Sequence, residues 1–257
     1  MRDLKIINSI KWLVTGLSMA MLKRTLRYRL QGDGAYWLQP VSSNKPQLFN
    51  RVDFILDHCR DKKVLHIGFT DHPYTEKKIN EGSLLHLHLQ KVTTGLAGMD
   101  VEENAIRQYE DLTKDAMVFA GDIMLEYPAP AVEFKPGLIL LSEVLEHLEE
   151  PYKAVDLLHK SFPAGTTILV TVPNYIALDS LAAGFNKTES IHPYHHWYFS
   201  PFTLQRLFDV KKFELNQLHF GMYYQPKSRI NPVFKKFPFN GDCIIALFTI
   251  LKSPDHE

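Results

Sequence analysis

Short apolar runs alternate with longer amphipathic stretches from about residue 49 to residue 252. Runs of this length, rich in branched aliphatic residues and followed by turn formers, are typical of strands buried on both faces. The predicted strands cover residues 63–68, 94–99, 117–120, 137–141, 166–172, 212–220 and 243–252. The last two have no predicted helix between them, so we expect them to pair.

Patterns with a helical period separate most of these strands. The clear cases cover residues 102–110, 151–161 and 201–208. Segment 83–92 is ambiguous, because LLHLHL alternates like a strand while Leu85, Leu89 and Val92 also share a helical face. Its place after a strand and a turn favours a helix. Such alternation of strands and helices predicts a mostly parallel sheet with helices on both faces.

Length and composition are compatible with an ordinary globular protein. The chain has 257 residues, which suits one α/β domain with an appendage or two small domains. Its hydrophobic content is 45% and its charged content is 23%, both ordinary for soluble proteins. Cys59 and Cys243 lie far apart and form no CxxC pair or disulfide framework. A reducing cytoplasm is therefore the default location.

Charge is unevenly distributed, although the formal net charge is zero. Residues 1–30 contain one acid, Asp3, and a set of basic residues interleaved with apolar ones: Arg2, Lys5, Lys11, Lys23, Arg24, Arg27 and Arg29. The apolar run from Trp12 to Leu22 is too short to span a bilayer. Two interpretations stand: a helix packed on the domain or on a second subunit of a homodimer, and a helix lying on anionic lipid.

Turn-forming residues dominate residues 31–48, which we interpret as a linker. The predicted division is therefore an N-terminal basic amphipathic helix and linker at 1–48 and one domain at 49–257. With the second interpretation of the N-terminal helix, the protein would sit in the cytoplasm, peripheral on the inner face of the membrane. A second basic segment covers residues 227–237. Zero net charge and the lack of a basic face beyond these two segments argue against nucleic acid as a partner.

Four residues with chemical potential follow predicted strands directly. In mostly parallel sheets, ligands bind beyond the carboxyl ends of the strands, so these residues are expected at the site. Gly68 lets backbone approach a ligand, and Asp100 can accept hydrogen bonds from a ribose diol. Asp122 can accept from an exocyclic amine, and Glu143 follows the strand where the catalytic face opens. Each carboxylate alone is also compatible with a helix cap or a solvated turn.

Three longer segments carry a family resemblance: LLSEVLEHLEEP at 140–151, LVTVPNY at 169–175 and HHWYFSPFTLQRLF at 195–208. With the strand-end acids, they resemble the class I S-adenosylmethionine-dependent methyltransferases, closest to a branch with "EVLEHL" after the fourth strand. The resemblance covers roughly residues 50 to 252. It implies a Rossmann-like, doubly wound α/β fold. The sheet would have seven mostly parallel strands, with the last strand antiparallel.

The resemblance also implies a site for S-adenosyl-L-methionine. Gly68 matches the first glycine of the cofactor loop, Asp100 the ribose-binding acid and Asp122 the adenine-contacting acid. The implied cofactor-binding set is completed by Thr70, Asp71, Val101, Ile123 and Ser142.

The cofactor loop departs from the family pattern. His66 replaces the acid before the first glycine, and Thr70 and His72 replace two further glycines. We expect Asp71 or a backbone carbonyl to receive the ammonium of the cofactor instead. A sulfonium nucleoside has no pyrophosphate, so it needs fewer glycines than a dinucleotide does. An NAD-type enzyme needs a glycine-rich loop for the pyrophosphate, so His72 in place of a glycine argues against this class.

A histidine- and tyrosine-rich segment, IHPYHHWY at 191–198, lies in the loop expected to cover the site. Histidine is a frequent general base for a hydroxyl acceptor, so His195 and His196 are candidate catalytic residues together with Glu143. The alternative is that these histidines pack the lid. No metal site is expected, because the spacing of His192, His195 and His196 fits no standard ligand pattern. His147 is expected to orient the loop after the fourth strand.

The resulting hypothesis is a methyltransferase that O-methylates a small molecule, a sugar or a lipid-linked glycan. The competing hypothesis is a catalytically inactive protein that keeps the fold for binding or scaffolding. The changed glycine loop motivates the second hypothesis, and the ordered acids and the His-rich lid motivate the first.

Overall fold

The computed structural model describes residues 41, 46–115, 117–223 and 238–252. The basic segment at 1–30 and most of the predicted linker lie outside these residues. Leu48, the last residue assigned to the linker, belongs to the first strand of the sheet.

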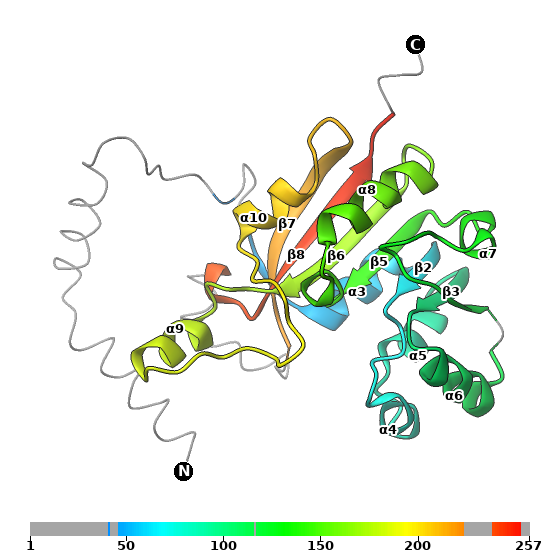
Figure 1. The fold of residues 1–257 in the computed structure, drawn as a ribbon, viewed down its shortest axis with the longest axis horizontal. Helices are drawn as coiled ribbons and strands as arrows, with labels where there is room; N and C mark the ends of the chain where they lie inside the picture. Colours follow the sequence, from blue (N-terminus) through cyan, green and yellow to red (C-terminus); the bar gives the residue numbers. More distant parts are fainter. Residues whose placement is uncertain (1–40, 42–45, 116, 224–237, 253–257) are drawn as a thin grey trace.

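In the described part of the chain, eight strands form one mixed sheet in the order β1-β7-β8-β6-β5-β2-β3-β4 (Figure 1). The strands are β1 (Leu48–Asn50), β2 (Lys63–Ile67), β3 (Gly95–Asp100), β4 (Val118–Ala120), β5 (Leu138–Ser142), β6 (Thr167–Pro173), β7 (Phe213–Met222) and β8 (Cys243–Ile250). Strand β8 lies antiparallel between β6 and β7, and the other pairs are parallel. The predicted Rossmann-like sheet with an antiparallel last strand is confirmed, with β1 as an additional strand.

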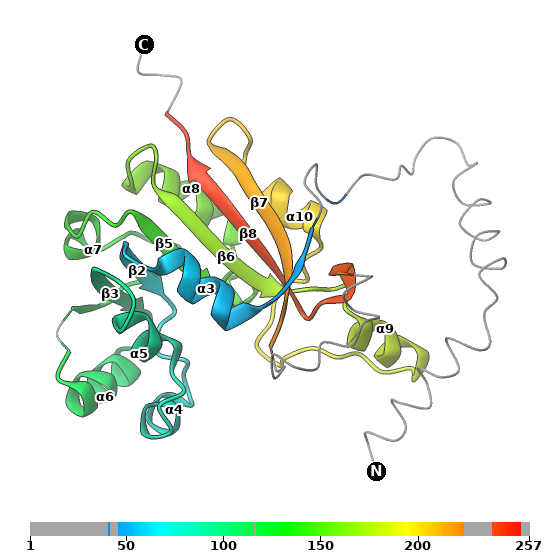
Figure 2. The same cartoon turned by 180° about the vertical axis from the view of Figure 1, so that it is seen from behind.

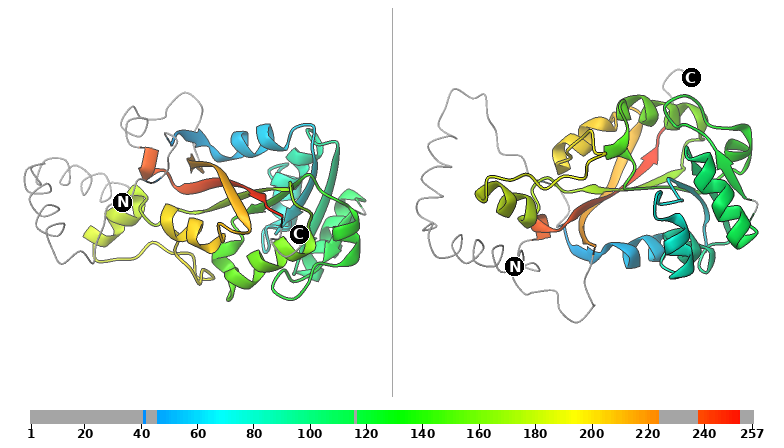
Figure 3. Two further views of the ribbon diagram at one scale, coloured as in Figure 1. Left: turned by 90° about the horizontal axis from the view of Figure 1, so that it is seen from above. Right: turned by 60° about the horizontal axis from the view of Figure 1, so that its bottom comes forward.

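Helices cover both faces of this sheet. They are α3 (Arg51–Cys59), α4 (Thr75–Asn80), α5 (Leu85–Gln90), α6 (Glu103–Thr113), α7 (Ala129–Glu133), α8 (Pro151–Ser161), α9 (Leu178–Phe185) and α10 (Pro201–Leu207), with short 3-10 helices η1 (Leu145–His147) and η2 (Pro238–Asn240). Helices α7, α8 and α10 pack on one face, and α3 and α5 pack on the other (Figure 2). Seen from above, the sheet lies between these two helix layers (Figure 3).

Strand β5 explains why the sheet is covered on both sides. Its sequence LILLS is apolar at four successive positions, so both of its faces need apolar partners. Ile139 and Leu141 belong to the core cluster that includes α8, and Leu138 and Leu140 belong to the cluster that includes α3. All four side chains are fully buried, so β5 is the centre of a two-sided core.

The ambiguous segment 83–92 forms the helix α5, as its position predicted. Leu89 and His86 are buried and share one side of the helix, while the outer residues are more accessible. One correction concerns the segment expected to cover the site. It is not a loop throughout, because helix α9 forms part of it.

No helix within the described residues combines the length and the hydropathy needed to cross a membrane.

Candidate functional site

Strand register brings the predicted cofactor residues to one edge of the sheet. Ile67 at the end of β2 pairs with Met99 of β3 and with Leu141 of β5. The residues that follow these positions therefore leave the sheet at the same level. At this carboxyl edge lie Gly68, Asp100, Ser142 and Glu143, with Asp122 after the neighbouring strand β4.

Gly68 occupies a position that only glycine tolerates. Its φ is +72°, in the left-handed region, and its N–H donates to the carbonyl of Met99 at 2.8 Å. A Cβ here would lie 2.6 Å from Cγ2 of Val144, so a side chain would collide as well as strain the backbone. The predicted turn is therefore present, and the chain after β5 packs closely against it.

Asp100 stabilises the loop after β2 through hydrogen bonds with Thr70. Its Oδ2 accepts from the N–H of Thr70 at 3.0 Å and from the Thr70 hydroxyl at 2.8 Å. Its Oδ1 accepts from the N–H of Glu102 at 3.1 Å. A carboxylate offers about four acceptor positions, so Asp100 keeps one for a hydroxyl of a ligand. Thr70, which stands where the family has a glycine, therefore hydrogen bonds to the ribose-binding acid predicted at position 100.

Asp71 forms an ion pair with Lys78 of α4. The expected contact between Asp71 and the ammonium of the cofactor would require this pair to open. The side chain of Asp71 is 44% exposed, so the pair exchanges readily with solvent.

The side chains at the nucleoside end of the predicted site make fewer hydrogen bonds within the described part of the protein. Oδ1 of Asp122 accepts from the N–H of Met124 at 2.8 Å, which leaves its second oxygen available. Val101 is 62% exposed and presents an apolar surface directly after Asp100. Ile123 is buried, so its contribution at the edge is through backbone. This combination of an apolar surface and acceptor oxygens suits a nucleoside.

Glu143 lies in a buried polar network that joins distant parts of the chain. Tyr223, after β7, donates its hydroxyl to Oε2, and Thr171 of β6 donates to Oε1 at 2.8 Å. Arg51, the first residue of α3, donates to the hydroxyl of Ser142 at 2.6 Å. Glu143 itself has a φ of +59°, which is uncommon for a residue with a side chain.

Burial raises the pKa of Glu143, although the nearby Arg51 and the hydrogen bonds from Tyr223 and Thr171 act in the opposite direction. Glu146 is fully buried, and its carboxyl oxygens have no hydrogen-bond partner among the described residues. Burial and the neighbouring Glu143 raise the pKa of Glu146 well above its usual value. Both carboxyl groups therefore hold their protons to a higher pH than an exposed glutamate does.

The lid loop is held against η1 by several hydrogen bonds. The N–H groups of His196 and Trp197 lie 2.8 and 3.3 Å from the carbonyl of Glu146. The indole N–H of Trp197 donates to the carbonyl of Leu148 at 2.8 Å. Nδ1 of His147 lies 3.2 Å from the carbonyl of Tyr194, so this side chain joins the segment after β5 to the lid loop.

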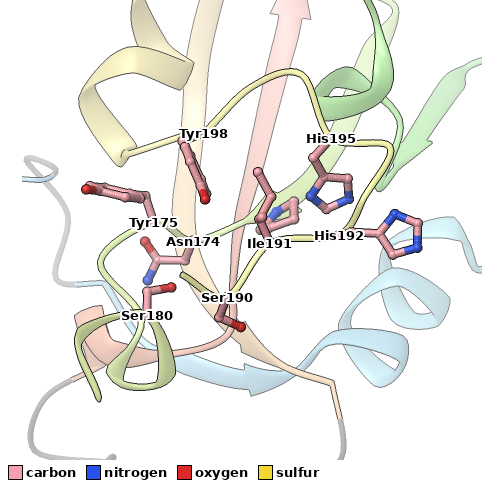
Figure 4. Close-up of a pocket in the computed structure, with 9 residues that line it drawn as sticks. Asn174, Tyr175, Ser180, Ser190, Ile191, His192, His195 and Tyr198 are labelled. Atoms are coloured by element: carbon pink, nitrogen blue, oxygen red, sulfur yellow. The ribbon is translucent and has the colours of Figure 1, made fainter. Parts of the chain in front are cut away.

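A cavity of about 110 Å³ lies under the lid, at the end of β6 (Figure 4). The rings of Tyr175 and Tyr198 form part of its wall, with centroids 4.9 Å apart. His192 and His195 also line it, whereas His196 is not among its lining residues. Burial and the neighbouring histidines lower the pKa of His195 to about 4. Its imidazole is therefore neutral at pH 7 with a free lone pair, and it is a weaker base than an exposed histidine.

Sequence reasoning missed several residues of this site. Arg51 and Tyr223 hydrogen bond to residues 91 and 80 positions away, and no sequence pattern links positions so distant. Glu146 was within a quoted motif, and its apolar neighbours Leu145 and Leu148 were a signal of burial.

No protein-family model and no curated protein sequence matches the chain. Solved methyltransferases nevertheless share its architecture. The S-adenosylmethionine dependent methyltransferase from Mesorhizobium loti has a TM-score of 0.50 at 12% identity, covering 77% of this chain and 95% of the other. The small RNA methyltransferase HEN1 has a TM-score of 0.52 at 14% identity, covering 87% of this chain and 28% of that one.

A third structure is N-methyltransferase NodS from Bradyrhizobium japonicum with S-adenosyl-L-homocysteine, which has a TM-score of 0.47 at 16% identity, covering 89% of this chain and 98% of the other. The fold is established by the first two structures, whose TM-scores are 0.50 and 0.52. At such low identities the likeness establishes the fold alone. The chain therefore has the class I methyltransferase fold.

Proposed function

We propose that this protein is an S-adenosylmethionine-dependent methyltransferase whose acceptor is a hydroxyl of a small molecule, a sugar or a lipid-linked glycan. One observation carries the proposal. Ser142, Gly68, Asp100 and Asp122 lie in that order along the carboxyl edge of the adjacent strands β5, β2, β3 and β4, in a fold used by methyltransferases.

The nucleoside half of the cofactor fits the residues at this edge. The remaining acceptor position of Asp100 would bind a ribose hydroxyl, and the second oxygen of Asp122 would bind the adenine amine. Val101 would cover the adenine ring, and the backbone at Ile123 would lie beside it. The methionine half would meet Thr70, Ser142 and, after opening of its ion pair, Asp71. When bound, the cofactor would supply an activated methyl group on a sulfonium.

The acceptor would occupy the cavity under the lid. Tyr175 and Tyr198 provide flat apolar surfaces that suit a sugar ring. Methyl transfer is an in-line displacement, so aligning the acceptor is the main catalytic requirement. His195 lines the cavity with a neutral imidazole and would take the hydroxyl proton.

His196 and Glu143, the other predicted catalytic residues, have different roles in this proposal. The backbone of His196 fixes the lid to η1, so this residue would position His195. Glu143 is hydrogen bonded to Tyr223 and Thr171 and would hold the shape of the methionine end.

Binding of S-adenosyl-L-homocysteine, measured by isothermal titration calorimetry, tests the cofactor site. We expect the wild type to bind and Asp100→Asn to bind roughly 10- to 100-fold more weakly, because a charge-assisted hydrogen bond is lost. Asparagine keeps a carbonyl for the Thr70 contacts. Asp111→Asn, at an exposed position of α6, is the matched control and should bind like the wild type. Absence of binding at millimolar ligand would overturn the proposal.

Methyl transfer is tested separately with radiolabelled S-adenosylmethionine and candidate hydroxyl acceptors. We expect His195→Gln to lower the rate of methyl transfer and to leave the binding of S-adenosyl-L-homocysteine unchanged. This result would support a proton-accepting role for His195. Cofactor binding without transfer to any acceptor would instead indicate a protein that uses the fold for binding.

We also propose that residues 1–30 bring the protein to the inner face of the membrane, where a lipid-linked acceptor would be presented. Their basic residues suit anionic headgroups, and the apolar ones suit the interface. The alternative is that the same segment mediates a homodimer. Co-sedimentation of the full chain with phosphatidylserine vesicles distinguishes the two, since a dimerisation segment would leave the protein in the supernatant.

A further inference from the structure

Three histidine side chains from two separate segments converge beside the cavity. His147 ends η1, and His192 and His195 lie in the lid loop 45 or more residues later. One potential ligand nitrogen from each residue lies within 4.8 Å of those of the other two. The ring centroids of His147 and His195 are 4.6 Å apart, and those of His192 and His195 are 5.1 Å apart.

We propose that this three-histidine cluster binds one divalent first-row transition-metal ion, with Zn²⁺ as the reference case. Imidazole nitrogens suit zinc, cobalt, nickel and copper, whereas magnesium and calcium prefer oxygen ligands. Among the described residues, no carboxylate belongs to the cluster. The ligand chemistry therefore selects against the hard cations.

The proposal revises the sequence-based expectation of no metal site. Spacing within the lid pointed to His192, His195 and His196, a set with no standard pattern. The fold replaces His196 with His147, which the sequence places far from the other two. Only the pairing of η1 with the lid brings the third ligand into position.

The surroundings of His147 resemble those of a metal ligand. Its Nδ1 lies 3.2 Å from the carbonyl of Tyr194, which can only accept a hydrogen bond. Nδ1 therefore carries the proton, and Nε2 is left with its lone pair. Ligating histidines commonly donate their second ring nitrogen to a backbone carbonyl in this way, which fixes tautomer and ring orientation.

Backbone contacts hold the two ligand-bearing segments together. The carbonyl of Glu146, next to His147, accepts from the N–H groups of His196 and Trp197, next to His195. The indole of Trp197 adds a bond to Leu148 on the other side of His147. The cluster is thus supported on both sides of its η1 ligand, which lowers the entropy lost on metal binding.

Metal binding would require a modest contraction. Zinc–nitrogen bonds of roughly 2.0–2.1 Å in a tetrahedral site place ligand nitrogens about 3.4 Å apart. The present limit of 4.8 Å is larger, and His147 and His192 are exposed, so their rings can turn inward. His192 would give up a long contact of 3.4 Å from the N–H of Tyr194 to its Nδ1.

Three protein ligands leave a fourth coordination position open. Because His192 and His195 also line the cavity, an ion held here would lie beside it (Figure 4). On the basis of the proposed function, the open position would accept an oxygen of the acceptor, and in the metal-bound protein His195 would be a ligand and no longer the proton acceptor. Metal binding itself does not depend on that function.

The test uses the full chain after treatment with EDTA. We expect isothermal titration with Zn²⁺ to give one ion per chain, and titration with Co²⁺ to give the visible absorption bands of a tetrahedral site. Each of His147→Ala, His192→Ala and His195→Ala should weaken binding on the order of 100-fold. His196→Ala, in the same loop but outside the cluster, should bind like the wild type. Mg²⁺ should give no heat.

Thermal unfolding without metal checks that each variant is folded, which their partly exposed positions favour. Absence of Zn²⁺ binding to the wild type would overturn the proposal. Binding that survives all three cluster substitutions would mean an adventitious ion only. This outcome is independent of the cofactor. Binding of S-adenosyl-L-homocysteine without binding of Zn²⁺ would overturn the metal site alone. Binding of Zn²⁺ without binding of S-adenosyl-L-homocysteine would overturn the methyltransferase proposal alone.

Discussion

His66 occupies the position where the resembling family has an acid, and the structure gives this residue a different partner. Its Nδ1 lies 3.2 Å from Nδ1 of His86 on α5, and both side chains are buried. One nitrogen must donate and the other accept, which two neutral imidazoles can do. Two neutral imidazoles avoid burying a charge at the base of the loop, whereas a carboxylate at this position would bury one.

This pair predicts a loss of stability on acidification. Burial lowers the pKa of both residues, well below the usual value for His66 and to about 4 for His86. Between these values and the unfolded pKa of about 6.5, the unfolded chain binds more protons, so stability rises with pH. Going from pH 7 to pH 5 should cost about 2 kcal/mol from His86 alone.

Urea denaturation at pH 7 and pH 5 checks this prediction. His86→Gln keeps a polar partner for His66 but removes one titrating group, so its unfolding free energy should fall less on acidification than that of the wild type. His88→Gln, two residues along the same helix, is the control and should follow the wild type. Equal pH dependence in His86→Gln would contradict the prediction.

At the scale of elements, helices α6, α8 and α10 were predicted from their apolar patterns and α5 from its position after a strand and a turn, whereas helices with a single buried residue were not. Helix α8 begins at Pro151 and ends at Ser161, as its pattern predicted, because proline suits a helix start and its apolar positions repeat. Helices α4, α7 and α9 have five to eight residues, and each buries a single residue fully. One buried residue defines no period, so packing rather than pattern forms these helices.

Strand β3 shows how packing limits a residue that sequence alone leaves free. A Cβ added at Gly98 would lie 2.8 Å from Cδ1 of Phe69, whose ring is buried beside the cofactor loop. Gly98→Ala should therefore destabilise the protein by about 1–3 kcal/mol through overpacking. Gly137→Ala is the control, because the nearest atom to its Cβ would be the Lys63 carbonyl oxygen at 3.9 Å.

Urea denaturation of the two glycine variants measures the difference. Gly98→Ala should lower the urea concentration at the midpoint of unfolding without changing the dependence of the unfolding free energy on urea concentration. Gly137→Ala should have a midpoint close to that of the wild type. Equal midpoints would mean that Phe69 moves away without cost. If Gly98→Ala does lower the midpoint, adding Phe69→Leu should recover part of the lost stability, since the shorter side chain leaves room for the methyl group.

At the scale of the whole molecule, the sequence predicted the layers of the fold but not what joins its ends. The alternation of strands and helices sufficed for a parallel sheet, and the antiparallel last strand came from the family resemblance. Arg51 and Tyr223 come from opposite ends of the described chain and meet Ser142 and Glu143 at the centre of the sheet edge. Such contacts depend on the completed fold, so no local pattern records them.

Arg51 is the cation of this buried network, and its removal should make stability more sensitive to pH. Its charge opposes the effect of burial on the Glu143 carboxyl, whose pKa is raised in the folded protein. A raised carboxyl pKa means that the folded state binds more protons, so stability falls as pH rises through that range. Arg51→Met should raise this pKa further and leave Ser142 without its donor.

The expected loss in Arg51→Met is about 3 kcal/mol at pH 8 and smaller at pH 5, because removing the cation near a buried carboxyl group is costly only when that group is charged. Urea denaturation at both pH values measures it, with Arg60→Met, at the exposed end of the same helix, as the control. Adding Glu143→Gln to Arg51→Met removes the unpaired charge and should restore most of the stability at pH 8. If the double variant is as unstable as Arg51→Met, then packing of the arginine side chain, rather than its charge, holds the two ends of the chain together.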